Sequence, residues 1–397
     1  MPAIPVVVEN RSLSELRPQL LMLPGPTPLP QAVLQALSGP MINHRGPAFA
    51  ELFAEIEKGL SWAFQTEHRV LMLTGSGTTG MEASLLNLFS PGDKVLAVSN
   101  GSFGERWGDM AAVYGLEVER LVYDWGKPIQ TQDLRSKLQA DKAQTIKAVL
   151  IIHNETSTGV LNPLQEMAAI VREHGALVIV DAISSLTSTP LPMDAWGLDV
   201  VLGASQKGFM VPPGLAFVAL SAKAWEVHAK ARLPRFSLDF SLTREYAEQG
   251  WTPWTPPIPL FYGLKVALQM MQAEGLEQIQ ARHLHLMQTV RAGLKGMGLE
   301  LMIPDERQAS RAVTPVYPPP GLDADDIRKS LLEEYNIVLG GGQRKLTGQI
   351  FRVGHLGYQH LPNIWATLIA LEQTLKKRGY PVPAGISIAA TDPDYEY

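Results

Sequence analysis

Short apolar runs alternate with amphipathic stretches between about residues 69 and 220. Runs rich in β-branched residues predict strands, whereas apolar positions spaced three and four residues apart predict helices. Helices are predicted at residues 79–89, 105–114 and 164–174. This alternation predicts an α/β fold in which a mostly parallel sheet lies between helices. The predicted strands are RVLML, KVLAV, KAVLIIH, ALVIVDA, DVVLGA and LAFVAL.

Two proline-rich segments flank this region, LMLPGPTPLP at residues 21–30 and WTPWTPPIP at residues 251–259. Because proline restricts the backbone and cannot donate a hydrogen bond, both segments are expected to be extended. A long helical pattern follows from residue 260, and the remainder predicts a smaller α+β domain. We therefore expect an N-terminal arm at 1–20, a large domain at 21–275, a small C-terminal domain at 276–385 and a tail at 386–397.

The composition is that of a soluble globular protein, with 46% hydrophobic residues, 18% charged residues and a net charge of −5. No run of lysine and arginine is visible, so nucleic acid is not an expected partner. The sequence contains no cysteine, which excludes disulfides, thiolate metal sites and cysteine nucleophiles, and we expect no metal.

The N-terminus has no basic region of the kind that precedes a secretory signal. No apolar stretch approaches the roughly 20 residues that a membrane-spanning helix needs. We expect a cytoplasmic protein that is not bound to a membrane.

Polar residues gather where predicted strands end, which is the edge at which open α/β sheets bind ligands. The first group is LTGSGTTG at residues 73–80, between a strand and a helix. Its glycines and the following helix N-terminus could hold a phosphate, with the Ser76 and Thr78 hydroxyls as further donors. The alternative is an ordinary glycine-rich turn with capping hydroxyls. The segment lacks the Walker A and dinucleotide signatures, which disfavours a nucleotide.

Two further groups follow later strands. The segment HNETSTG at residues 153–159 could serve a ligand, or it could be a turn that caps the next helix. Asp181 ends the apolar run LVIV. A carboxylate there is costly to bury unless it meets a cation or a strong donor, so we expect a positive group to face it. The alternative for Asp181 is a helix cap.

The fourth group is SQKG, which contains Lys207 between Gly203 and Gly208. A lysine at this sheet edge can lose its hydration, which lowers its pKa toward use as a nucleophile, although a solvated lysine is the simpler alternative. Taken together, a phosphate cradle, an acid for a ring nitrogen and a lysine for an aldehyde are what pyridoxal 5'-phosphate (PLP) needs.

From LPGPTPLP to FRVGHLG the chain resembles the class V aminotransferases of fold type I, and within them the alanine-glyoxylate and serine-glyoxylate group. The SGT turn, NETSTG, VDAISS and SQKG carry the resemblance. The spacing between Asp181 and Lys207 is also similar to that of the family. The resemblance implies a large PLP-binding domain with a mostly parallel seven-stranded sheet between helices, and a smaller C-terminal α+β domain.

The resemblance also implies cofactor roles for individual residues. Lys207 would bind the cofactor covalently and move the substrate proton, and Asp181 would pair with the protonated ring nitrogen. Thr156 would hydrogen-bond the phenolic oxygen of the cofactor. Phe103 would stack on the ring where many relatives have tryptophan, and Trp107 is its rival for this role. The phosphate would be held by Ser76, Gly77, Thr78 and Gln206, and by Thr255 from a neighbouring subunit, which implies a homodimer with shared active sites.

Substrate residues follow from the same resemblance. Arg352 in FRVGHLG matches the arginine that binds the substrate carboxylate, a planar fork suited to that group; a surface ion pair is the alternative. Gly25 in PGPT would let the backbone approach the ligand closely. The run from Gly340 to Gly342 predicts a flexible turn. Arg45 in NHR could read a second polar group on the donor, but we favour an ion pair at the dimer interface.

The function implied is a ping-pong transamination between alanine or serine and glyoxylate, giving glycine and a 2-keto acid. The two donors differ by one hydroxyl, which an apolar pocket separates poorly, so the sequence does not choose between them. Alternatives are a ureidoglycine-glyoxylate, an aspartate-type or, with less support, a phosphoserine aminotransferase. Cysteine desulfurases of the family are excluded because the chain has no cysteine. A non-catalytic accessory subunit, of the kind named soluble-hydrogenase small subunit, is the alternative from another class.

Overall fold

The computed structural model describes residues 18–391, so most of the predicted N-terminal arm and the end of the predicted tail lie outside the described residues. A seven-stranded sheet has the order β2-β10-β9-β8-β5-β3-β4, and every strand is parallel to its neighbours except the antiparallel β10. The predicted α/β fold with a mostly parallel sheet is confirmed. The strands are β2 (Val70–Gly75), β3 (Lys94–Ser99), β4 (Glu117–Val122), β5 (Ile146–Ile152), β8 (Leu177–Asp181), β9 (Val200–Ala204) and β10 (Gly214–Leu220).

The periodicity did not predict β4. Its sequence EVERLV alternates exposed and half-buried positions, and it lies at the edge of the sheet with β3 as its neighbour. An edge strand has one solvated side, so it needs no continuous apolar run and is easily mistaken for a loop.

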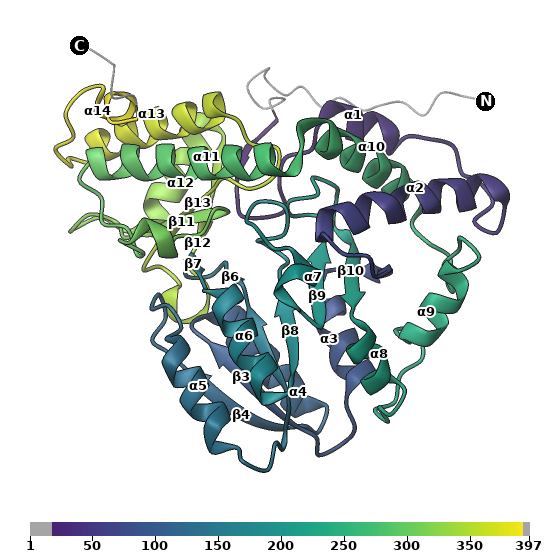
Figure 1. Cartoon of the computed structure of the whole chain (residues 1–397). Helices are drawn as coiled ribbons and strands as arrows, with labels where there is room; N and C mark the ends of the chain where they lie inside the picture. The colour runs from purple at the N-terminus through teal and green to yellow at the C-terminus, as the bar shows by residue number, and fades with distance from the viewer. Residues whose placement is uncertain (1–17, 392–397) are drawn as a thin grey trace.

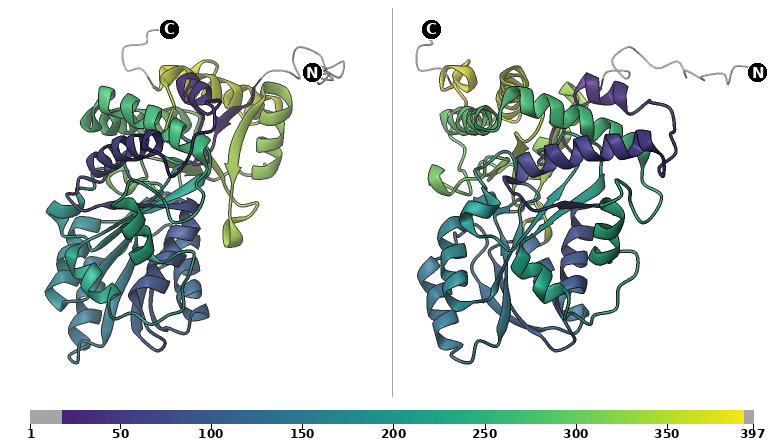
Figure 2. Two further views of the ribbon diagram at one scale, coloured as in Figure 1. Left: turned by 90° about the vertical axis from the view of Figure 1, so that its right-hand side faces the viewer. Right: turned by 45° about the vertical axis from the view of Figure 1, so that its right-hand side comes forward.

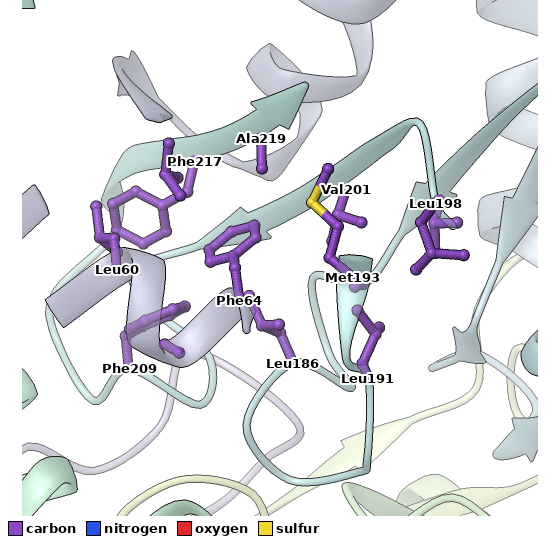
Figure 3. Close-up of a cluster of buried hydrophobic side chains, with 14 of the residues drawn as sticks. Leu60, Phe64, Leu186, Leu191, Met193, Leu198, Val201, Phe209, Phe217 and Ala219 are labelled. Atoms are coloured by element: carbon purple, nitrogen blue, oxygen red, sulfur yellow. The ribbon is translucent and has the colours of Figure 1, made fainter. Parts of the chain in front are cut away.

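Helices cover both faces of the large sheet (Figure 1). Alternate residues of each strand point to opposite faces, so neighbours such as Leu71 and Met72 belong to different apolar clusters. In Figure 3 the rings of Phe64 and Phe217 lie close together, and Phe217 also packs edge-on against Phe209 at 4.9 Å. One cluster includes α3 (Gly77–Leu88), α4 (Ser102–Val113) and α8 (Ala222–His228), and the other includes α2 (Pro47–Phe64), α5 (Thr131–Ala140), α6 (Leu164–His174) and α10 (Ile258–Glu274).

A second sheet of four strands has the order β1-β12-β13-β11. Its first strand pairs in parallel with β12, so residues 20–22 join the smaller sheet although they precede the large one in the chain. The chain then passes from this sheet to the edge of the large sheet. The strands are β1 (Leu20–Met22), β11 (Val313–Val316), β12 (Ile337–Gly341) and β13 (Phe351–Gly354), and the helices around them are α11 (Leu276–Gly296), α12 (Ala324–Tyr335), α13 (Leu361–Lys377) and α14 (Ile386–Ala389).

Helices α2 and α10 lie side by side across one face of the large sheet, as Figure 2 shows from two directions. Between residues 18 and 391 none of the helices has the length and apolar character needed to cross a bilayer. The short elements that remain are α1 (Gln31–Ala36), α7 (Met193–Trp196), α9 (Phe240–Ala247), β6 (Asn154–Glu155), β7 (Val160–Leu161) and two short 3-10 helices, Glu306–Gln308 and Arg344–Leu346.

Candidate active site

A cavity of about 200 Å³ lies at the carboxyl edge of the large sheet. It brings together residues that are far apart in the sequence, because β2, β5 and β8 end at this edge and the turn after β9 reaches it. The residues predicted from the sequence that line it are Ser76, Gly77, Thr78, Phe103, Thr156, Asp181, Gln206 and Lys207; Met81, Arg106, Asn154, Ile183 and Ser184 complete the wall.

The N-terminus of α3 forms one wall of the cavity. Ser76 precedes the helix, but its side chain makes no capping hydrogen bond. The Ser76 hydroxyl therefore does not cap the helix, as the alternative of an ordinary capped turn would require. The N–H groups of Gly77 and Thr78 have no hydrogen-bond acceptor among the described residues. A side chain at Gly77 would lie 2.4 Å from Ile183. Free donors and the positive end of the helix dipole make this wall suited to an anion.

Asp181 lies at the end of β8 and is buried in the cavity wall. Its Oδ1 accepts a hydrogen bond of 2.9 Å from the Ile183 N–H, within a turn and not at the start of an α-helix. The pKa of Asp181 is raised to about 7, chiefly by burial; the Ile183 hydrogen bond opposes this rise, Glu155 adds to it, and the charges of Lys207 and Arg106 oppose it. Lys207 and Arg106, which line the same cavity, are thus positive groups near Asp181, and they only partly offset the cost of burial.

Lys207 contacts the first proline-rich segment. Its Nζ donates a hydrogen bond of 2.9 Å to the Pro24 carbonyl. Thr27 binds the same turn twice, because its N–H donates to the Gln206 carbonyl at 3.1 Å and its hydroxyl donates to the Lys207 carbonyl at 3.1 Å. A Cβ atom on Gly25 would lie 2.6 to 2.8 Å from the Lys207 side chain. Residues 24–27 thus hold the lysine in place.

The pKa of Lys207 is lowered to about 8. Burial is the main cause of the lowering; the Asp181 carboxylate opposes it and the Arg352 guanidinium adds to it. A substantial fraction of the amine is therefore uncharged at neutral to mildly basic pH, and the uncharged form is the nucleophile.

The segment around β6 supplies the third wall. The hydroxyls of Thr156 and Ser184 are hydrogen-bonded at 2.7 Å, and the Asn154 side-chain amide donates to Ser184 at 2.8 Å. Asn154 Oδ1 and Gln206 Oε1 are buried without a hydrogen-bond partner among the described residues. Buried polar atoms without partners are costly, and their place in the cavity wall fits a site built for a polar ligand.

Phe103 and Trp107 lie in different environments. Phe103 lines the cavity, and the Arg106 guanidinium lies 4.8 Å from the centre of its ring. Trp107 is 1% exposed and packs in the apolar cluster between α4 and the sheet. Phe103 is therefore the aromatic ring available to a ligand in this cavity.

Arg352 lies on β13 of the small sheet, buried beside the cavity wall. Its Nε donates to the Gly341 carbonyl at 2.8 Å and its Nη1 donates to the Thr156 carbonyl at 2.9 Å. It is not a surface ion-pair arginine. Burial lowers its pKa to about 10, although Glu155 opposes this, so Arg352 remains a cation. Gly340 and Gly341 belong to β12, so the prediction of a flexible turn was wrong there.

Thr255 and Arg45 lie away from the cavity. Thr255 is exposed on the second proline-rich segment. Arg45 contacts the same segment, since its Nη2 donates to the Pro253 carbonyl at 2.9 Å and its guanidinium lies 4.6 Å from the Tyr246 ring. Within the chain Arg45 positions this segment, and its role at an interface stays a prediction.

The polar residues in or beside the cavity wall that were not predicted from the sequence as site residues are Asn154, Glu155, Ser184 and Arg106, and the apolar Met81 and Ile183 were not predicted either. The first two belong to NETSTG and the third to VDAISS, so the signal was present but the roles were not assigned. Arg106 is three residues after Phe103, and helical spacing could have placed both on one face. Among the described residues, no group of three or more His, Cys, Asp or Glu side chains could hold a metal ion.

An α/β fold with an anion-binding helix N-terminus, a buried acid and a lysine of lowered pKa at one sheet edge defines the fold-type I class of PLP-dependent proteins. The family model described as aminotransferase class-V matches residues 20–354, and the chain belongs to this family. Its cofactor is PLP. The free N–H groups at the open α3 N-terminus fit the phosphate of that group, and the buried polar side chains of Asn154 and Gln206 fit a polar ligand in the cavity.

Curated relatives match nearly the whole chain. The chain is 47% identical to the soluble hydrogenase small subunit of Synechococcus sp. (strain PCC 6716), over 91% of this chain and 94% of that protein. It is 37% identical to the L-aspartate-glyoxylate aminotransferase of Paracoccus denitrificans, with 94% and 96% covered. It is 35% identical to the serine-glyoxylate aminotransferase of Arabidopsis thaliana, with 93% of each covered.

Solved structures show the same architecture. The ureidoglycine-glyoxylate aminotransferase of Bacillus subtilis matches with a TM-score of 0.89 and 30% identity, over 94% of this chain and 97% of that chain. The alanine-glyoxylate aminotransferase of Nostoc sp. matches with a TM-score of 0.87 and 34% identity, over 93% and 97%.

Proposed function

We propose that this class V aminotransferase transfers an amino group from alanine or serine to glyoxylate, giving glycine and a 2-keto acid. One observation carries the proposal: Lys207, Asp181 and the α3 N-terminus line one cavity, with the Arg352 guanidinium next to it. Relatives of the chain are named for glyoxylate together with serine, alanine or aspartate, which supports these substrates.

Each wall of the cavity would hold one part of the cofactor. The Gly77 and Thr78 N–H groups, with Ser76 and Gln206, would bind the phosphate. Thr156 would donate to the phenolic oxygen, and Asp181 would accept from the ring nitrogen. The Phe103 ring would cover one face of the cofactor. When bound, PLP supplies an aldehyde that takes up the amino group and a ring that withdraws electrons from Cα.

Lys207 Nζ would do the proton chemistry. Its lowered pKa lets the uncharged amine remove the proton from the substrate Cα. The resulting ammonium would then donate that proton to C4′ of the cofactor. The hydrogen bond to the Pro24 carbonyl holds Nζ in the cavity. Asp181, ionised beside a protonated ring nitrogen, would keep the ring in its electron-withdrawing form.

Arg352 would bind the substrate carboxylate. Two of its nitrogens donate to backbone carbonyls, while Nη2 makes no hydrogen bond with the described residues. The guanidinium is thus oriented in advance and keeps a donor for a ligand.

Thr255 would reach the phosphate of a neighbouring subunit in a homodimer. Trp254 beside it is 42% exposed, Phe236 is 76% exposed, and their rings lie 5.2 Å apart. Two exposed aromatic rings in contact next to Thr255 support a subunit interface at this surface.

The test is the absorption spectrum of the purified protein as alanine, serine or aspartate is added separately, followed by glyoxylate. We expect the band of the bound cofactor to bleach with alanine or serine and to return with glyoxylate. Bleaching with aspartate alone would replace the proposed donor by a dicarboxylate. A protein without any cofactor band would instead favour a non-catalytic accessory subunit, the alternative suggested by the relative named soluble hydrogenase small subunit.

A further inference from the structure

Glu155 is a buried carboxylate without a role in the mechanism above. It ends β6, is 0% exposed, and lies between Asn154 and Thr156 of the cavity wall. Its Oε2 accepts hydrogen bonds from the N–H groups of Phe103 at 3.0 Å and Gly104 at 3.1 Å. The carboxylate therefore connects the cavity wall formed by Asn154 and Thr156 to the backbone of Phe103, whose ring lines another part of the cavity.

The second oxygen of Glu155 is also fully used. Oε1 accepts from the Ser157 N–H at 3.1 Å and from the Ser157 hydroxyl at 2.6 Å. The Ser157 hydroxyl oxygen in turn accepts from the Ser102 N–H at 2.9 Å. Burial raises the pKa of Glu155, and the four donated hydrogen bonds oppose that rise. All four partners donate, which suits an ionised acceptor.

The first turn of α4 depends on this contact. The residue at its N-cap, Gly101, has no side chain with which to cap the helix. The Glu155 and Ser157 side chains satisfy the N–H groups of Ser102, Phe103 and Gly104 instead. A helix N-terminus leaves such donors free and carries a partial positive charge, so a carboxylate placed there stabilises the turn.

Gly101 makes room for the carboxylate. A Cβ atom on Gly101 would lie 2.3 Å from Glu155 Cγ, 2.5 Å from Cδ and 2.6 Å from Ser157 Oγ. Its φ of 179° is extended backbone that any residue adopts. Glycine is required here for space, which is an observation independent of the hydrogen bonds.

We propose that Glu155 is a positioning residue that holds the Phe103 ring over the cofactor by anchoring the first turn of α4. This inference rests on the proposed function, in which Phe103 covers the cofactor ring. The same segment binds Arg352 through the Thr156 carbonyl, so Glu155 joins the aromatic wall to the strand segment that orients the substrate arginine.

The principal test compares Glu155→Ala and Glu155→Gln in the PLP-loaded protein. Alanine removes every acceptor. Glutamine keeps one oxygen for the Phe103 and Gly104 N–H groups, and its amide faces Ser157, whose hydroxyl can reorient to accept although its N–H loses the acceptor. We expect PLP to bind about tenfold to a hundredfold more weakly in the alanine variant, and within about tenfold of wild type in the glutamine variant. The circular dichroism of the cofactor band should change in the same order.

A second readout needs neither cofactor nor activity. Amide hydrogen exchange in the first turn of α4, measured on the cofactor-free protein, should rise in Glu155→Ala and less in Glu155→Gln. Gly101→Ala keeps the carboxylate but occupies its space, so it should reproduce the faster exchange and the weaker PLP binding. This variant also keeps the test valid if Glu155→Ala does not fold.

Glu372 offers a matched control. It is 3% exposed and accepts from the N–H groups of Gly385 at 2.9 Å and Ser387 at 3.0 Å, as well as from the Ser387 hydroxyl, at a helix start in the small domain. We expect Glu372→Gln and Glu372→Ala to lower thermal stability while PLP affinity and the circular dichroism of the cofactor band stay unchanged.

The outcomes separate the two proposals. If Glu155→Ala loses stability but keeps wild-type PLP affinity, cofactor dichroism and exchange in α4, the carboxylate is merely structural and the inference is wrong. If the wild-type protein binds no PLP, the proposed function fails, and hydrogen exchange alone then decides whether Glu155 anchors Phe103.

Discussion

Gly25 and Lys207 are in direct contact although they are far apart in the chain. Gly25 has φ +135°, and a Cβ atom there would lie 2.7 Å from Lys207 Nζ. The neighbouring Pro24 carbonyl accepts a hydrogen bond from the same Nζ. The first proline-rich segment therefore sets the position of the amine, and the resemblance that placed Gly25 near the substrate pocket pointed to the right part of the molecule.

Gly25→Ala should slow the attachment of PLP to Lys207. Alanine at this φ is strained, and its methyl group would displace Nζ. We therefore expect PLP attachment to be slower by at least about tenfold, and the free energy of unfolding to fall by about 1–3 kcal/mol. Stopped-flow absorption measures the first effect and denaturant titration the second. Gly126→Ala is the control, because Gly126 also has positive φ, +88°, and contacts a flexible side chain, Met302, outside the cavity. An equal loss of stability with slow attachment in both variants would contradict the role of Gly25.

Lys207→Ala should abolish turnover while PLP still binds without a covalent bond, because the other cavity walls remain. We expect loss of at least about 10³-fold in kcat, as is common when a nucleophile and proton carrier is removed. Borohydride reduction followed by mass spectrometry tests the covalent link. Lys223→Ala is a matched control, since Lys223 also donates to a backbone carbonyl, that of Ala176 at 2.8 Å, away from the cavity. Full activity in Lys207→Ala would reject the mechanism.

The attachment of PLP to the cofactor-free protein should accelerate as pH rises through about 8, the pKa of Lys207. Only the uncharged amine attacks the aldehyde, so the rate follows its fraction. Asp181→Asn removes a charge that raises this pKa, and should shift the midpoint to lower pH. Arg352→Gln removes a charge that lowers it, and should shift the midpoint to higher pH. Rate profiles for the three proteins decide this, and shifts of the same sign in both variants would be inconsistent with the geometry.

Asp181→Asn should stabilise the cofactor-free protein at pH 8. The pKa of Asp181 is raised from 3.8 to about 7 by folding, so the folded state binds more protons than the unfolded chain between these values and stability falls as pH rises through that window. Asparagine avoids the buried charge and can still accept from Ile183. The gain should shrink toward pH 4. Asp199→Asn is the contrast: Asp199 accepts from the Val178 N–H and the Ser221 hydroxyl, and its replacement should destabilise at both pH values.

Substitutions of Phe103 and Trp107 should affect different properties, PLP binding for Phe103 and stability for Trp107. Phe103→Leu should weaken PLP binding by about tenfold with little loss of stability, because an aromatic stacking partner is lost from a half-buried position. Trp107→Leu should cost about 2–4 kcal/mol of stability through the cavity it leaves, with the cofactor band intact. Thermal unfolding and PLP titration of both variants provide the measurement, and the reverse pattern would assign the stacking role to Trp107.

The apolar runs of the sequence, and the polar residues at their ends, predicted the strands of the large sheet and the edge at which the site lies. Strands buried on both faces produce continuous β-branched runs, and parallel strands share one ligand-binding edge, so Asp181 and Lys207 could be placed together from the chain alone. The half-solvated edge strand β4 gave no such run and was missed.

Only the tertiary structure decided which contacts those residues make. The Pro24 carbonyl on Lys207, the Gly341 carbonyl on Arg352 and the Glu155 carboxylate on the Phe103 backbone join segments distant in sequence. Local patterns record whether a position is buried, but not which distant group it meets. The pKa values of Asp181 and Lys207 depend on that burial and on those neighbours, and therefore exist only once the chain has folded.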